Sequence, residues 1–322
     1  KVLQPERVTV TEPGDFRVLE ALQACARRLA IDIEVRADRH FYDTIDEFKA
    51  FADGRRELRL ENYYRLLRRR HDILMQEGRP LTGHWNFDAE NRRRLPAGAA
   101  AGIPQPVRFP PDSITRAVMA LVERRFPNAP GSARAFDHPV TAKDARRVLD
   151  DFVANRLPLF GTYQDAMASG KPYLYHSLLS SSLNLHLLDP RMAVDAALEA
   201  HADGSAPINA VEGFVRQILG WREYVRGIYW WSMPEYAAKN HLEAELPMPA
   251  FMWDADTGMR CVRESVTQLV EHGYAHHIQR LMVLGLLSML LGVRPYDVHR
   301  WHLSMYVDAV DWVSLPNVLG MS

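Results

Sequence analysis

The sequence has few cysteines, almost no net charge and no apolar stretch long enough to cross a membrane. Its 322 residues contain two cysteines, Cys25 and Cys261, so a disulfide framework is excluded and a reducing compartment such as the cytoplasm is expected. The most apolar run, residues 281–293, is too short to span a bilayer and predicts a buried helix. We therefore expect no membrane association.

The near-neutral charge also limits the possible partners. Lysine and arginine total 39 against 40 acidic residues, a net charge of −1, so the overall charge does not indicate a nucleic-acid partner. Any binding to DNA must depend on a local basic patch. The hydrophobic content of 47% is that of an ordinary globular protein, and a chain of this length can form two domains.

The first part of the chain has the pattern of an α/β layer. Residues 7–13 and 32–38 are typical of strands, and residues 16–31 between them have helical spacing. Proline, alanine, glycine and arginine then replace the periodic apolar residues for one stretch, after which helical patterns dominate. The sequence therefore predicts a partial α/β domain at 1–89, an interdomain loop at 90–111 and an all-helical domain at 112–322.

The second half contains few strand signals and several long helical patterns. Asn209, followed three residues later by Glu212, predicts a capping box at the start of one of them. The expected helices lie at 113–126, 142–157, 177–188, 208–231, 261–291 and 295–313.

A row of hydroxyl and amide side chains marks the expected helix 177–188. Ser177, Ser181 and Asn184 share one face, and Ser180 adds a further hydroxyl. Hydroxyls in the first turn of a helix, beside free backbone N–H groups, suit a phosphate or pyrophosphate. Ordinary capping and serine hydrogen bonds within the helix explain the same pattern.

Aromatic residues and arginines crowd the expected helix 208–231. Arg222 and Arg226 lie one turn apart, and Trp221 and Trp230 are close to them. Such a set could stack on bases or on a flavin. A core helix whose arginines extend towards solvent is the alternative.

Histidines and an arginine interrupt an otherwise apolar pattern at 272–280. His272 and His276 have the spacing of a metal-binding pair, but no third ligand has convincing spacing. His276 and His277 are also natural proton donors near neutral pH, and Arg280 follows them. Core histidines with satisfied hydrogen bonds remain the alternative.

The roles of two further groups of residues depend on what lies beside them. Arg92, Arg93 and Arg94 form a basic run in the expected interdomain loop, where they either face solvent or bind phosphates. The tryptophans at 253 and 301 are typical of a helical core, and they become an electron path only beside a redox cofactor.

Taken together, the ordered motifs resemble one family. The segments that carry the resemblance are GTYQDAM (161–167), YHSLLSSSLNLHLL (175–188), VEGFVRQILGWREYVRG (211–227), YAHHIQRLM (274–282), HRW (299–301) and DWVSLPNVLGMS (311–322), with residues 59–96 before them. They are similar to consecutive blocks of the iron–sulfur bacterial photolyases and cryptochromes, deoxyribodipyrimidine photolyase-related proteins of the (6-4) type. The resemblance implies a Rossmann-like α/β antenna domain followed by a helical domain that holds FAD.

The resemblance also implies a set of cofactor-binding residues. Arg280 and Asp308 match an arginine and an aspartate that pair beside the flavin ring, and a buried arginine needs such a partner. The other implied FAD contacts are Tyr163, Ser177, Leu179, Ser180, Asn184, Gln217, Arg222 and Ser314.

The function implied is light-driven repair of UV-damaged DNA, above all of (6-4) lesions, by electron transfer from FAD to a flipped lesion. His276 and His277 match the pair beside the lesion, with His277 as the proton donor, and Trp221 matches an aromatic residue that stacks on it. Trp301 and Trp253 match tryptophans that pass electrons to the flavin. A blue-light signalling cryptochrome is the alternative, and a helical interaction protein without cofactor is the third interpretation.

Three departures from the family pattern stand out. Relatives bind a [4Fe-4S] cluster through four cysteines, and Cys261 matches the first of them. We expect the other three, and most of the pocket for an antenna chromophore of the lumazine type, in a longer protein, which we expect to be a monomer. Ser314 stands where relatives often carry a glutamate near the flavin, and His302 replaces a common tyrosine.

Overall fold

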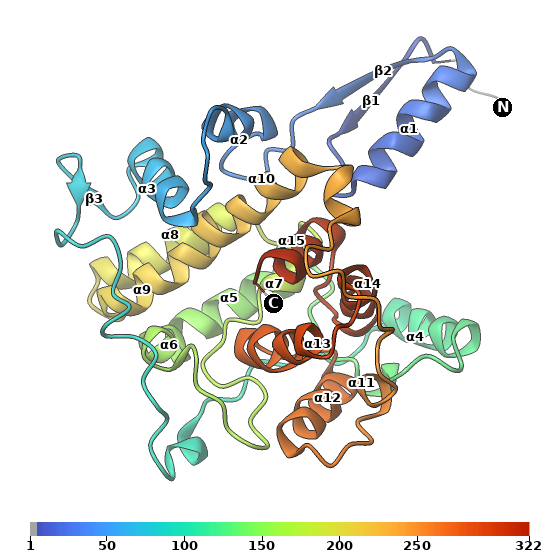
Figure 1. Ribbon diagram of the computed structural model, residues 1–322. Helices are drawn as coiled ribbons and strands as arrows, with labels where there is room; N and C mark the ends of the chain where they lie inside the picture. Colours follow the sequence, from blue (N-terminus) through green and yellow to red (C-terminus); the bar gives the residue numbers. More distant parts are fainter. Residues whose placement is uncertain (1–4, 322) are drawn as a thin grey trace.

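The computed structural model describes residues 5–321, and residues 1–4 and 322, at the ends of the predicted domains 1–89 and 112–322, lie outside it. A small strand–helix–strand unit projects from a large body of helices (Figure 1). The predicted α/β beginning and helical remainder are therefore confirmed.

The projecting unit consists of β1 (Arg7–Thr11), α1 (Phe16–Leu29) and β2 (Asp32–Arg36). The two strands pair in parallel with Arg7 opposite Asp32. The Asp15 carboxylate accepts a hydrogen bond from the backbone N–H of Arg17 and caps the start of α1. No residue of α1 is buried, so this unit contributes little to the main core.

The next two helices pack on the helical body. They are α2 (Ile45–Ala52) and α3 (Leu60–His71), followed by a two-residue hairpin of β3 (Met75–Gln76) and β4 (Arg79–Pro80). Phe48 of α2 and Leu67 of α3 belong to the same buried cluster as residues of the helical half. The division of the chain at residue 89 stays a prediction.

The remaining chain is helical, with two π-helical turns, Arg216–Arg222 and Ile278–Gly285. The α-helices are α4 (Ser113–Arg125), α5 (Ala142–Asn155), α6 (Leu157–Tyr163), α7 (Ser180–Asn184), α8 (Pro190–Ala202), α9 (Ile208–Val215), α10 (Glu223–Ser232), α11 (Phe251–Asp254), α12 (Arg260–His272), α13 (Leu286–Leu290), α14 (Pro295–Met305) and α15 (Asp311–Met321).

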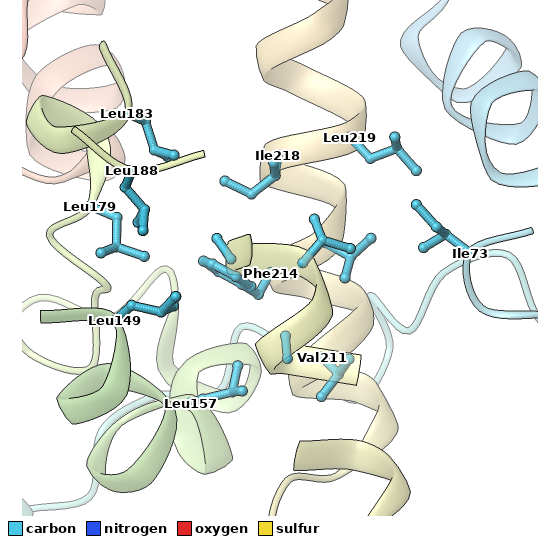
Figure 2. Packing of buried hydrophobic residues seen from close by; sticks show 14 of the residues in the cluster. Ile73, Leu149, Leu157, Leu179, Leu183, Leu188, Val211, Phe214, Ile218 and Leu219 are labelled. Atoms are coloured by element: carbon cyan, nitrogen blue, oxygen red, sulfur yellow. The ribbon is translucent and has the colours of Figure 1, made fainter. Parts of the chain in front are cut away.

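The largest core lies where α5, α6 and α9 meet the segment around α7. Phe214 of α9 points into a group of leucines that includes Leu149 and Leu179, and Ile218 and Leu219 extend it from the first π turn (Figure 2). These side chains are almost fully buried, and each buried leucine or phenylalanine contributes about 1.5–3 kcal/mol to stability. The core holds the elements that carry the candidate site.

Three of the predicted helices are interrupted or shortened. The pattern at 261–291 is broken after His272, because Gly273 adopts a positive φ of 60° and ends α12. The pattern at 295–313 is broken at 306–310, and only Ser180–Asn184 of the pattern at 177–188 is helical. The spacing of His272 and His276 therefore does not place them on one helix.

The predicted capping box at Asn209 is wrong. The helix begins at Ile208 with Pro207 as the preceding cap residue. Glu212 is buried instead, and its carboxylate accepts a hydrogen bond from the Tyr64 hydroxyl at 3.1 Å. The carboxylate binds a neighbouring helix because burial requires a partner for it.

The contact between α2 and α10 yields the first prediction. A Cβ atom at Gly227 would overlap the ring of Phe48, which is buried and cannot swing out. Gly227→Ala should lower the free energy of unfolding by about 1–3 kcal/mol through overpacking, measured by urea denaturation. Gly102→Ala is the control, because nothing lies within 4 Å of a Cβ atom there. Equal stability of both variants would contradict the packing described.

Candidate cofactor and substrate cavity

A cavity of about 590 Å³ lies within the helical half. Its walls come from the loop after β4, the end of α6, residues 176–184, both π turns and α15. Sites for small molecules and cofactors typically have volumes of about 300–1,000 Å³, so its size is that of a cofactor site. The breaks in the helical patterns bring these distant segments together.

The Arg280–Asp308 ion pair lies in the wall of the cavity. Arg280 Nη2 donates to Asp308 Oδ1 at 2.9 Å, and the Ser180 hydroxyl donates to the other carboxylate oxygen at 2.7 Å. Asn184 Nδ2 donates to the backbone oxygen of Asp308 at 2.7 Å. Burial alone would raise the pKa of Asp308, but Arg280 and Ser180 hold it below its ordinary value. The carboxylate is therefore ionised at neutral pH.

Arg222 brings a second buried cation to the cavity. Its Nη1 donates to Asn184 Oδ1 at 2.6 Å, and the guanidinium lies 4.8 Å from the ring centres of both Phe41 and Trp312. Burial lowers the pKa of Arg222 to about 10, so it remains charged. Its Nε has no hydrogen-bond partner, and it pairs with no carboxylate among residues 5–321. An anionic ligand would supply the missing partner.

The two π turns aim side chains at the cavity. The first carries Gln217, Trp221 and Arg222, and the second carries Arg280, all of which line the cavity. Gln217 Nε2 donates to the Gly213 backbone oxygen at 3.0 Å, which fixes the amide. A π turn inserts a residue into a helix and is frequent at functional sites.

Three histidines form one corner of the cavity. His276 is buried and stacks on His176, with ring centres 4.8 Å apart and planes at 13°. His277 is exposed to the space of the cavity. Burial lowers the pKa of His276 to about 4, and it also lowers the pKa values of His176 and His277. The two stacked rings are therefore neutral at neutral pH.

His176 was not predicted as a site residue. It precedes the serine row in the sequence, but its stacking partner lies a hundred positions further along the chain. Its Nε2 atom is buried without a hydrogen-bond partner, as is Nδ1 of His276. No spacing in the sequence could have revealed this contact, because it depends on how two non-helical segments, far apart in the chain, lie against each other.

The remaining predicted FAD contacts divide into two groups. Ser177 and Ser314 line the cavity together with Ser180 and Asn184. Leu179 instead points into the large core, and Leu178, at a positive φ of 59°, lines the cavity in its place. Tyr163 stacks on Tyr175 outside the cavity lining.

The two predicted electron-transfer tryptophans lie away from the cavity lining. Trp301 is fully buried, and its Nε1 donates to the Met252 backbone oxygen at 3.0 Å. Its ring meets Tyr306 edge-on at 5.9 Å, and the Arg280 guanidinium covers Tyr306 at 3.9 Å. Tyr306 thus connects Trp301 to the cavity wall. Trp253 is partly exposed on α11.

The predicted basic run lies at one edge of the cavity. All three arginines are exposed, and Arg92 also lines the cavity and forms ion pairs with Asp88 and Asp165. Cys261 is an exposed free thiol. In the described part of the chain no cluster of histidine, cysteine and acidic residues could hold a metal ion.

Comparison with known proteins shows which family the chain resembles. The profile of the family described as "Deoxyribodipyrimidine photo-lyase-related protein" matches residues 1–138. A protein of Agrobacterium fabrum named "(6-4) photolyase" is 46% identical over 320 residues, which cover 99% of this chain. The chain is therefore similar to this family over its first part and to this relative along nearly its whole length. It spans 63% of the length of this relative.

Two solved structures share the fold of this chain. The class III photolyase of Agrobacterium tumefaciens superposes with a TM-score of 0.60 at 16% identity, over 97% of this chain and 60% of that one. The cryptochrome of Synechocystis gives 0.60 at 15% identity, over 98% and 61%. A protein of Acanthamoeba polyphaga mimivirus is 29% identical over 112 residues, 34% of this chain and 85% of that protein. The predicted photolyase/cryptochrome architecture is confirmed.

Across the part that the structure describes, no helix is both long and apolar enough to pass through a bilayer.

The buried histidine at 302 yields a prediction for pH dependence. Its ring stacks on Tyr306, its Nε2 has no partner, and burial lowers its pKa to about 3. An unfolded histidine titrates near pH 6.5, so unfolding takes up a proton below that pH and stability falls as the pH is lowered. Between pH 6.5 and 4.5, the free energy of unfolding should therefore fall by about 1–2 kcal/mol less in His302→Phe than in the wild type.

The measurement is urea unfolding at three pH values across this range. The same substitution at the exposed His241 controls for the loss of a histidine as such. An unchanged pH dependence in His302→Phe would show that this ring is not held neutral in the folded protein.

Proposed function

We propose that the chain binds FAD in the cavity of the helical half and repairs UV-damaged DNA in light, with (6-4) lesions as the main substrate. The observation that carries the proposal is the Arg280–Asp308 pair beside a cavity of cofactor size, together with the cation of Arg222 that lacks an anionic partner. The 46% identical relative named "(6-4) photolyase" supports the choice of lesion. The protein would act as a monomer in a reducing compartment such as the cytoplasm.

The residues present fit the cofactor. Arg222, Ser177, Ser180 and Asn184 would hold its phosphates and ribityl chain, because they offer a buried positive charge and hydrogen-bonding side chains along one wall. Gln217 and the Arg280–Asp308 pair would contact the polar edge of the flavin ring. When bound, reduced and excited by light, FAD supplies the electron that opens the lesion.

The chain's own groups would position the lesion and move a proton. Trp221 would stack on the flipped base, since its ring lines the cavity. His277 would donate a proton to the lesion, because it is the member of the histidine corner that is exposed to the cavity. His276 would orient the site through its stack on His176.

Electrons for reducing the flavin would come from Trp301, with Trp253 further out. Tyr306 lies between Trp301 and Arg280 and offers a path of aromatic contacts to the cavity wall. The indole N–H of Trp301 is fixed by a backbone carbonyl, which keeps the ring in place. Replacement of Trp301 would then slow flavin photoreduction.

The other cofactors of the family are not held by these residues. A [4Fe-4S] cluster requires four thiolates, and Cys261 is the single cysteine of the helical half. We propose that Cys261 is one ligand of a cluster completed in a longer protein, which would also hold the antenna chromophore. The predicted domains 1–89 and 112–322, joined by 90–111, are part of the same proposal.

A signalling cryptochrome is the second candidate. Ser314 lies in the cavity wall at the position where relatives often carry a glutamate. A hydroxyl lacks the negative charge of a carboxylate, so the flavin environment would differ and repair would be weaker. Such a protein would bind FAD and undergo photoreduction without lesion turnover.

Light-dependent repair of a defined oligonucleotide separates these functions. The purified protein is reduced, mixed with a duplex that contains one (6-4) lesion, and illuminated with blue light. We expect the lesion to disappear in light but not in darkness, and a duplex with a cyclobutane dimer to be repaired more slowly. Flavin binding without repair of either duplex would favour the signalling function.

The buried ion pair predicts that removal of its carboxylate weakens FAD binding. Asp308→Ala leaves Arg280 without its carboxylate and frees Ser180, so FAD affinity should fall by about 10–100-fold. Fluorescence titration of apoprotein with FAD measures this loss, and thermal unfolding shows whether the variant folds. Asp256→Ala is the control, because Asp256 is exposed and outside the cavity lining. A folded Asp308→Ala protein with normal FAD affinity would contradict the assignment.

The histidine corner predicts unequal roles for neighbouring residues. His277→Ala should lower the repair rate by about 10²–10⁴-fold and leave FAD content and photoreduction near normal, as expected for loss of a proton donor. His276→Ala should have a smaller effect on the repair rate, because that ring is buried in a stack. The reverse order of the two variants would show that the assignment of the lesion-facing histidine is wrong.

A further inference from the structure

Arg92 connects two acidic side chains at the edge of the cavity. Its Nη2 lies 3.4 Å from Asp88 Oδ1, and its Nε lies 3.2 Å from Asp165 Oδ2. Asp88 also binds Arg216 at 2.6 Å, so one of the two carboxylates has a second cation. Asp165 depends on Arg92 alone for an ion pair in the described part of the chain.

The backbone fixes this arrangement. The N–H of Arg92 donates to the Gly161 oxygen at 3.3 Å, and the N–H of Arg93 donates to the Thr162 oxygen at 2.7 Å. These contacts attach the loop to α6, whose last residue, Tyr163, lies two positions before Asp165. Arg92 also has a positive φ of 64°, an unusual backbone conformation for a residue other than glycine. The loop therefore holds the arginine in register with the carboxylate.

His277 shares the cavity with this ion pair. Burial within the cavity walls lowers its pKa, Asp165 acts against this effect, and Arg280 and Arg92 reinforce it. Among these neighbours Arg280 is already paired with Asp308. The balance between Arg92 and Asp165 is therefore the part of its surroundings that a ligand at the cavity edge can change.

The other two histidines cannot take over as proton donors. His176 and His276 stack on each other, and burial holds both neutral at neutral pH. A second positive charge in this corner would be unfavourable next to Arg280. Proton donation to a lesion thus requires protonation of His277 in particular.

We propose that Arg92 offsets the charge of Asp165, so that the buried corner keeps His277 neutral, until a DNA backbone phosphate takes Arg92 and leaves Asp165 free to stabilise the protonated imidazole. Asp165 is then a positioning residue that acts through His277, and Arg92 couples DNA binding to proton donation. The proton comes from bulk water, resides on His277 and passes to the lesion. The proposal rests on the proposed function, because it requires DNA at the cavity edge.

Competition between Asp165 and a DNA phosphate for Arg92 is physically reasonable. Arg92 and Asp165 are both partly exposed, and an exposed ion pair contributes only about 0–1 kcal/mol. A phosphate can therefore replace the carboxylate at little cost, and arginine binds phosphate through two parallel hydrogen bonds. The released carboxylate remains attached to the end of α6, facing the same cavity as His277.

NMR titration of His277 tests the proposal without using repair activity. The flavin-loaded protein, labelled with ¹³C-histidine and kept in darkness, is titrated between pH 5 and 9, and His277→Ala assigns the signal. Asp165→Asn should lower the pKa of His277 by about half a pH unit, and Arg92→Gln should raise it by a similar amount. Arg93→Gln is the matched control and should leave it unchanged, since Arg93 is exposed and forms no ion pair among residues 5–321.

A second titration adds an undamaged 15-base-pair duplex. DNA should raise the pKa of His277 in the wild type by about half a pH unit or more, and this rise should largely disappear in Asp165→Asn. A full rise in Asp165→Asn would show that the DNA charge acts directly, and this would overturn the proposal. Unchanged values in both Arg92→Gln and Asp165→Asn would overturn it too.

Failure of the proposed function would give a different result from failure of the coupling between Arg92 and His277. A protein that binds and repairs no lesion would fail the illuminated repair assay, whatever the titrations of the free variants show. A protein that repairs lesions but whose His277 pKa does not respond to Arg92→Gln would retain its function and lose this coupling.

Discussion

The arrangement of the site depends on the need to neutralise charge inside a body of helices. Arg280 lies largely buried beside the cavity, where an unpaired guanidinium would be strongly destabilising. The Asp308 carboxylate meets it, and Ser180 and Asn184 fix Asp308 from the segment around α7. One ion pair thus connects three distant parts of the chain and defines the cavity between them.

Interrupted helices make this arrangement possible. A regular helix through residues 295–313 would carry Asp308 on the helix surface, whereas the break between α14 and α15 places it in a turn beside Arg280. The π turns act in the same way for Arg222 and Arg280. The irregular backbone is therefore concentrated where polar side chains enter the cavity, as is common at functional sites.

The sequence predicted the elements better than their interruptions. The helix 113–126 was located within one residue, because Asp112 caps its start and the apolar periodicity is clear. The apolar pattern of 261–291 continues across Gly273, so periodicity alone could not reveal the break. The family resemblance supplied the Arg280–Asp308 pair, which the structure contains, but it could not supply the His176–His276 stack or the ion pairs of Arg92, which depend on packing between segments far apart in sequence.

The central claim is that the helical half forms a flavin site centred on the Arg280–Asp308 pair. The most direct test is the absorption spectrum of the purified protein after incubation with FAD and removal of unbound cofactor. The account predicts flavin bands and one FAD per chain, identified by mass after release from the protein. A folded protein that retains no flavin after this treatment would contradict the claim.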